Sequence, residues 1–167
     1  MKLRIIGCPE KKDFQPFVRR AAEFYANELI SKKMLDNIFV KIKFNKKLDV
    51  YGYASVEECN DSGKPREFLI EVNPLIGARD ILKTIAHEMV HIKQYAYCET
   101  NEAMTHWKGT RINSDDIDYW DHPWEIEAHG REDGLFTKFA NRECLWEVFK
   151  MSNPNDPIKQ EPLGWRT

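Results

Sequence analysis

The amino-acid sequence predicts an α+β fold, in which an N-terminal helix precedes a three-stranded sheet, a second helix, a loop and a C-terminal helix. Apolar residues recur at helical spacing in the first two helical segments, and the first of the three segments between them alternates apolar and other residues at period two. With 167 residues, the chain is long enough to bury one core. We therefore expect a single domain over residues 1–151, followed by an extended or partly disordered tail over residues 152–167.

The first helix is predicted over Asp13–Ile30, where apolar side chains fall three and four residues apart. Asp13 can cap its N-terminus, and Pro16 is tolerated in a first turn. The preceding segment, MKLRIIGCPE, has too short an apolar stretch for a signal peptide, which needs roughly 7–15 such residues. This segment is expected to form a short strand or a packed N-terminus.

The three strands are expected over residues 37–44, 50–58 and 67–74. Alternation is clearest in the first of them, NIFVKIKF, and it predicts a strand with one buried face. The segment NDSG that precedes the third strand has the composition of a turn, and Pro74 ends that strand.

The remaining elements are two helices and the loop between them. The second helix has Asp80 as a plausible cap and carries an apolar stripe. Residues 100–123 are polar and irregular, apart from HWKGTRI, which can form a small hairpin that turns at Gly109. The last helical region is expected over residues 124–150, with an interruption near Gly134.

Charge and cysteine content narrow the function classes. The net charge of −2 gives no general attraction to nucleic acid or anionic lipid, so we expect neither partner. No segment approaches the roughly 18 apolar residues of a membrane span. The four cysteines are far apart and form no C-x-x-C pair, which disfavours a disulfide framework or a cysteine zinc site and favours the reducing cytoplasm.

The segment TIAHEMVHIKQY contains the motif H-E-x-x-H on the second predicted helix. Residues four apart share a helix face, so His87 and His91 can direct both imidazoles at one zinc ion. Glu88 then lies beside the open coordination position. There it can take a proton from a metal-activated water and pass it to the leaving amine.

A catalytic zinc site needs a third protein ligand, and Glu125 is the favoured candidate. It opens the segment WEIEAH on the last predicted helix. There the small residue Ala128 would let this helix closely approach the helix that carries His87 and His91. The metzincin class is excluded because no glycine and histidine follow His91 at the required spacing. Four other residues remain alternatives for the third ligand: Glu127, His129, His122 and His106.

The combination of H-E-x-x-H with a later E-x-x-A resembles the gluzincin branch of zinc metallopeptidases. This resemblance implies a zincin-like fold in which His87, His91 and Glu125 bind zinc and Glu88 is the catalytic glutamate. Minimal single-domain gluzincins have an E-x-x-A-D motif, whereas this chain has His129 at the aspartate position.

A longer pattern, YWDHPWEIEAHGRE, is similar to small SprT-like or putative metallopeptidase proteins, many of them encoded by tailed bacteriophages. SprT and Spartan proteins themselves use a third histidine, which is a departure from the ligand set expected here. If the chain is phage-encoded, the expected location is the cytoplasm of the host.

These patterns together predict a zinc metallopeptidase that hydrolyses a peptide or protein substrate. Tyr119 and His129 are the candidate catalytic groups besides Glu88, since each could donate a hydrogen bond to the oxyanion; His122 and Arg131 are alternatives. An edge strand is expected to pair with the extended substrate. Two other functions stay open: a catalytically inactive zinc-binding structural or interaction protein, and a zinc hydrolase of non-peptide amides.

Overall fold

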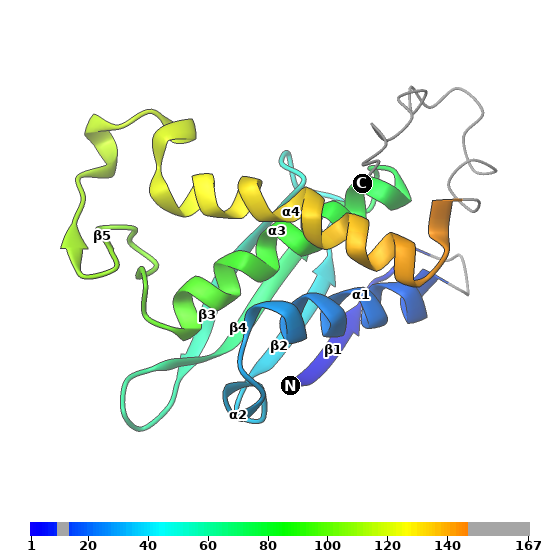
Figure 1. Cartoon of the computed structure of the whole chain (residues 1–167), viewed down its shortest axis with the longest axis horizontal. Coiled ribbons are helices and arrows are strands. Elements are labelled where there is room, and N and C mark those ends of the chain that lie inside the picture. The colour runs from blue at the N-terminus through cyan, green and yellow to red at the C-terminus, as the bar shows by residue number, and fades with distance from the viewer. Residues whose placement is uncertain (10–13, 147–167) are drawn as a thin grey trace, which may run out of the picture.

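The computed structural model describes residues 1–9 and 14–146. The predicted cap Asp13, the end of the last predicted helix and the predicted tail lie outside these residues. The helices and strands, in chain order, are β1 (Lys2–Ile6), α1 (Phe14–Leu29), α2 (Lys32–Leu35), β2 (Phe39–Phe44), β3 (Gly52–Cys59), β4 (Pro65–Val72), α3 (Ala78–Ala96), β5 (His106–Trp107), β6 (Thr110–Arg111) and α4 (Pro123–Arg142). Figure 1 shows their arrangement and confirms the α+β class.

Within the described residues the main sheet has four strands, in the order β1-β2-β4-β3. The three expected strands all form, but the expected three-stranded sheet is wrong in number because the N-terminal segment adds β1. Strand β1 pairs in parallel with β2, and β2 pairs in parallel with β4, whereas β3 is antiparallel to β4. Strand β3 is therefore an edge strand.

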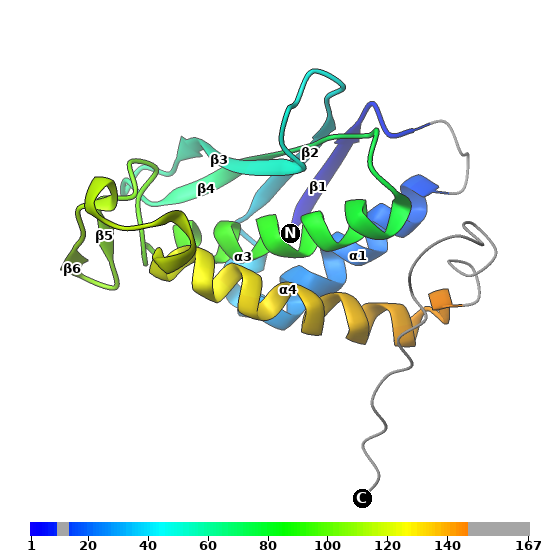
Figure 2. The same ribbon diagram turned by 90° about the horizontal axis from the view of Figure 1, so that it is seen from above.

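The helices α1, α3 and α4 all lie on one side of this sheet (Figure 2). Helix α3 lies between the sheet and α4, so it is covered on two sides. In β2, Val40, Ile42 and Phe44 are buried, and the alternating Lys41 and Lys43 project to the opposite face. This is the half-buried strand that the period-two pattern predicts.

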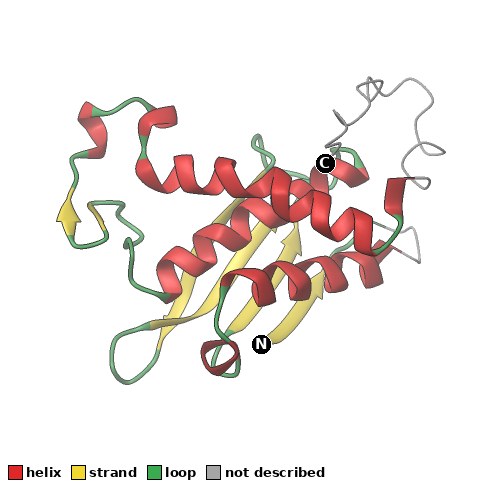
Figure 3. Cartoon of the chain, viewed as in Figure 1, coloured by secondary structure: helices red, strands yellow, loops and turns green. Residues whose placement is uncertain are grey.

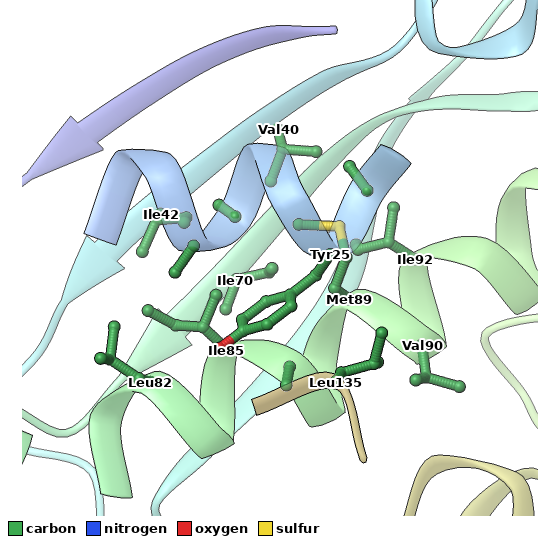
Figure 4. Packing of buried hydrophobic residues seen from close by; sticks show 14 of the residues in the cluster. Tyr25, Val40, Ile42, Ile70, Leu82, Ile85, Met89, Val90, Ile92 and Leu135 are labelled. Atoms are coloured by element: carbon green, nitrogen blue, oxygen red, sulfur yellow. The ribbon is translucent and has the colours of Figure 1, made fainter. Parts of the chain in front are cut away.

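The core fills the space between the sheet and the helices (Figure 4). Tyr25 of α1 lies among apolar side chains from the strands and from α3, and it is fully buried. The buried residues of α3 include Ile85, Met89 and Ile92, which belong to the predicted apolar stripe. The stripe faces the core, so the remaining faces of α3 are free to carry polar side chains.

Helix α4 runs without a break from Pro123 to Arg142, so the predicted interruption near Gly134 is wrong. Pro123 occupies the first turn, where its missing N–H costs no hydrogen bond. Leu135, Phe136 and Phe139 are buried in the core cluster just beyond Gly134. Their packing holds the glycine-containing segment helical.

The segment between α3 and α4 contains the short β5–β6 hairpin, which confirms the predicted turn at Gly109. Lys108 and Gly109 both have positive φ, as the type I′ turn of a two-residue hairpin requires. Two single-turn helices, Ser114–Asp116 and Tyr119–Asp121, then lead into α4 (Figure 3). In the part of the chain that the structure describes, no helix has the length and apolar character to cross a membrane.

Candidate metal centre

His87 and His91 lie one turn apart on the face of α3 that α4 covers, and Glu125 approaches them from the first turn of α4. The two imidazole Nε2 atoms are 3.1 Å apart. The Glu125 carboxylate lies 3.4 Å from Nε2 of His87 and 3.6 Å from Nε2 of His91. All three residues are buried, with exposed fractions of 6–9%. One nitrogen from each histidine and one oxygen of Glu125 therefore converge on a common point.

Gln94 fixes the orientation of His91. Its side-chain nitrogen donates to the carbonyl oxygen of Trp124 and to Glu127, at 2.9 and 3.1 Å. The amide oxygen is therefore left to accept a hydrogen bond from Nδ1 of His91, at 2.8 Å. With the Nδ1 proton assigned in this way, Nε2 of His91 is the ring nitrogen available to a metal ion at the point where the ligand atoms converge.

Glu132 has the corresponding role at His87. Its carboxylate accepts a hydrogen bond from Nδ1 of His87 at 2.8 Å. Burial alone would lower the pKa of His87, but the hydrogen bonds with Glu125 and Glu132 outweigh burial and raise that pKa to about 10. At neutral pH Nε2 of His87 therefore holds a proton close to Glu125, at the point where a cation would bind.

The donor set fits a zinc ion. Two imidazole nitrogens and one carboxylate are zinc ligands, and three protein ligands leave a further position open. His87, His129 and Glu132 form a second group of potential ligands, but this group shares His87 and includes two less buried residues. The hydrogen bond from Nδ1 of His87 to Glu132 makes Glu132 an outer partner of the first group instead. We therefore take the buried group His87, His91 and Glu125 as the candidate metal site.

Glu88 lies at the wall of a cavity of about 480 Å³ that opens beside this site. Gly52, at the start of the edge strand β3, comes close to it: a Cβ atom at position 52 would lie 3.4 Å from Oε1 of Glu88. Burial raises the pKa of the Glu88 carboxyl above its usual range. A raised carboxyl pKa brings proton uptake and release closer to neutral pH, as a general base and acid requires.

Tyr119 and His129 line the same cavity. The Tyr119 hydroxyl donates a hydrogen bond to Glu125 at 2.9 Å, and burial together with Glu125 raises its pKa. The His129 ring packs against His87, with ring centroids 4.5 Å apart, and against the exposed Trp120, with ring centroids 4.9 Å apart. Both candidate catalytic side chains therefore lie beside the metal ligands.

The other candidate ligands do not join the group of atoms from His87, His91 and Glu125. Glu127 is bound to Lys93, Gln94 and Arg131, so it supports Gln94 and does not join the ligand atoms. Nε2 of His122 lies 3.2 Å from the carbonyl oxygen of Ser114, and His106 belongs to the β5–β6 hairpin.

Sequence reasoning did not identify Glu132 and Gly52. Glu132 follows Glu125 by seven residues, which is two helical turns, so helical periodicity alone could have indicated that both face α3. Gly52 carries no comparable signal, because its closeness to Glu88 depends on how α3 packs against β3.

Comparison of the chain with protein-family models, with curated proteins and with solved structures found no match. The assignment of this site therefore depends on its residues and their geometry.

Proposed function

We propose that the protein is a zinc metallopeptidase of the gluzincin type. The observation that supports this most directly is the convergence of Nε2 of His87, Nε2 of His91 and the Glu125 carboxylate, with Glu88 beside them at the cavity wall. His87, His91 and Glu125 would hold the zinc ion. When bound, zinc supplies a Lewis acid that lowers the pKa of water and polarises a substrate carbonyl.

Glu88 is the general base and acid of the reaction. Its carboxylate accepts a proton from the attacking water and then returns that proton to the nitrogen of the leaving amine, so the peptide C–N bond breaks as a C–O bond forms. The burial of Glu88 supports this role because a buried carboxyl takes up and releases a proton nearer neutral pH than an exposed one.

Tyr119 stabilises the negative charge that develops on the carbonyl oxygen. Its hydroxyl lies beside the ligand Glu125, and its raised pKa keeps it protonated as a donor. His129 is the second candidate donor, since its ring lies over His87 and lines the cavity.

The substrate pairs as an extended chain with the edge strand β3. Strand β3 lies at the edge of the sheet, and its first residue is next to Glu88. Unpaired backbone groups of an edge strand can form a ladder with a peptide of any sequence, which orients its backbone across the site.

Substitution of Glu88 by Gln separates a peptidase from a structural zinc protein. The E88Q protein should bind one equivalent of zinc, measured by elemental analysis, and should lose peptide hydrolysis by at least about a thousandfold because the general base is gone. Glu28, in a surface ion pair with Lys138, is a matched control: Glu28→Gln should leave turnover unchanged.

Two results would contradict the proposal. If wild-type and E88Q proteins hydrolyse peptides at equal rates, Glu88 has no catalytic role. If the zinc-loaded wild-type protein cleaves no peptide, the structural alternative is favoured; if it cleaves only non-peptide amides, the alternative of an amide hydrolase is favoured.

A further inference from the structure

The cavity beside Glu88 extends along α3 toward the N-terminus of that helix. Asp80, Thr84 and Glu88 are spaced four residues apart on α3, so they form one row, and all three line the cavity. Glu88 follows Asp80 by eight positions on the helix, which is roughly 12 Å along the axis. A substrate side chain that extends from the bond at Glu88 toward the N-terminus of α3 would have to pass Thr84, so only a long one would reach Asp80.

Asp80 is an exposed carboxylate that lines this end of the cavity. Among residues 1–9 and 14–146 it forms neither an ion pair nor a side-chain hydrogen bond. Lys83, a basic residue of the cavity wall, is bound to Asp133 at 2.7 Å and lies 3.9 Å from Glu132. Its charge is therefore already balanced, and the end of the cavity at Asp80 carries a negative charge available to a ligand.

The cavity also has apolar lining residues. Val50 and Tyr51, which directly precede β3, line the cavity and are exposed, with exposed fractions of 52% and 62%. Lysine and arginine combine a long apolar stem with a charged end. The stem can pack against Val50 and Tyr51 while the charged end reaches Asp80, and a cation can also lie over the Tyr51 ring.

From this arrangement we infer that the cavity selects peptides with a lysine or arginine next to the scissile bond, and that Asp80 is the residue that recognises the basic side chain. This inference rests on the proposed peptidase function and names its substrate class. Asp80 also lies in the first turn of α3, where a negative charge stabilises a helix, so the test must separate recognition from helix stability.

The test is to map the cleavage sites of the zinc-loaded protein in a diverse peptide mixture by mass spectrometry. The wild-type protein should cleave sites with Lys or Arg at one fixed position beside the scissile bond. In Asp80→Asn, kcat/KM for these peptides should fall by about tenfold or more, while kcat/KM for a matched leucine peptide changes less than twofold. Asp80→Arg should reverse the preference toward Asp or Glu at the same position, which a purely structural role of Asp80 would not produce.

Asp61, an exposed residue in the turn between β3 and β4, is the matched control. Asp61→Asn removes the same charge at the far end of β3 and should leave the preference unchanged. Cleavage without enrichment of basic residues, or with an enrichment that Asp80→Asn leaves intact, would overturn the inference but not the peptidase function.

If the wild-type protein cleaves no peptide, a binding measurement tests whether Asp80 recognises a basic side chain. Labelled hexapeptides that differ only in one Lys, Leu or Glu are titrated into zinc-loaded Glu88→Gln protein and into the double variant with Asp80→Asn. Tighter binding of the Lys peptide that disappears in the double variant supports recognition by Asp80 even without turnover. Equal binding of the three peptides rejects it.

Discussion

The two histidines of the site are held by partners of different charge. Nδ1 of His87 donates to the carboxylate of Glu132, whereas Nδ1 of His91 donates to the neutral amide of Gln94. A carboxylate partner makes an imidazole a stronger metal ligand than an amide does, because its negative charge stabilises the electron-poor ring. His87 should therefore be the histidine whose metal binding depends more on its partner.

Removal of Glu132 tests this dependence. Glu132→Ala should weaken zinc binding by roughly 10–100-fold, and Glu132→Gln, which keeps a hydrogen-bond acceptor but loses the charge, should restore part of the affinity. The affinity is measured by competition with a chelator of known zinc affinity. Asp133→Asn is the control, since Asp133 is bound to Lys83 and not to a histidine. An unchanged affinity in Glu132→Ala would show that Glu132 does not support the metal site.

Local spacing explains which site residues could be predicted from the sequence. His87, Glu88 and His91 follow from one helical motif, and the choice of Glu125 over Glu127 agrees with the structure, where Glu125 and not Glu127 lies with the two histidine nitrogens. That these residues bind zinc stays a prediction. The role of Glu127 could not be read from the sequence, because its partners Lys93 and Gln94 lie on another helix.

At the scale of elements, the contact between β3 and α3 determines how close the edge strand comes to Glu88. A Cβ atom at position 52 would lie only 2.5 Å from Cγ2 of Thr84 and 2.9 Å from the carbonyl oxygen of Glu71. Both distances are far shorter than a normal contact, and one of the atoms belongs to the backbone. Only glycine allows β3 and α3 to approach in this way.

Gly52→Ala should therefore destabilise the protein by about 1–3 kcal/mol, as overpacking of a tight contact does, and should also lower activity by displacing the strand beside Glu88. The free energy of unfolding is measured by denaturant titration. Gly134→Ala is a suitable control: a Cβ there meets no described atom within 4 Å, and alanine in a helix should add about 0.5–1 kcal/mol of stability. Equal effects of the two substitutions would contradict the tight contact at Gly52.

Long-range pairing determines what the local sequence pattern leaves open. The period-two alternation of residues 37–44 is enough to indicate β2. The N-terminal segment is short, and it becomes β1 only because it pairs with β2 across the intervening α1. Similarly, the two glycines of α4 suggest a break locally, but the packing of Phe136 and Phe139 in the core stabilises the helix across them.

At the scale of the whole molecule, the candidate ligands join two layers of the fold. His87 and His91 belong to the helix that packs on the sheet, and Glu125 belongs to α4, which packs on the outside of that helix (Figure 2). A zinc ion held by all three residues would link the layers directly. Zinc should therefore stabilise the whole fold and not only the site, because a ligand that binds the folded state shifts the folding equilibrium.

Zinc at a hundred times its Kd should add about 2.7 kcal/mol, or roughly 5–10 °C in Tm for a chain of this size, and a chelator should remove the increase. Glu125→Ala should abolish the zinc-dependent increase. Glu127→Ala should retain it, because Glu127 contacts Gln94 and not the converging ligand atoms. Retention in Glu125→Ala and loss in Glu127→Ala would transfer the ligand role to Glu127.

The zinc-dependent increase in Tm should also depend on pH, and the protonation of His87 determines the direction of that dependence. Its pKa is raised in the folded protein to about 10, so in the absence of zinc the protonated imidazole stabilises the fold fully below its ordinary pKa and less as pH rises toward 10. Zinc must displace that proton, so its affinity should rise about tenfold per pH unit for each proton released. The zinc-dependent rise in Tm at fixed free zinc should therefore be larger at pH 8 than at pH 6. A rise in Tm that is equal at both pH values would show that zinc does not displace the His87 proton, and hence that His87 is not a ligand.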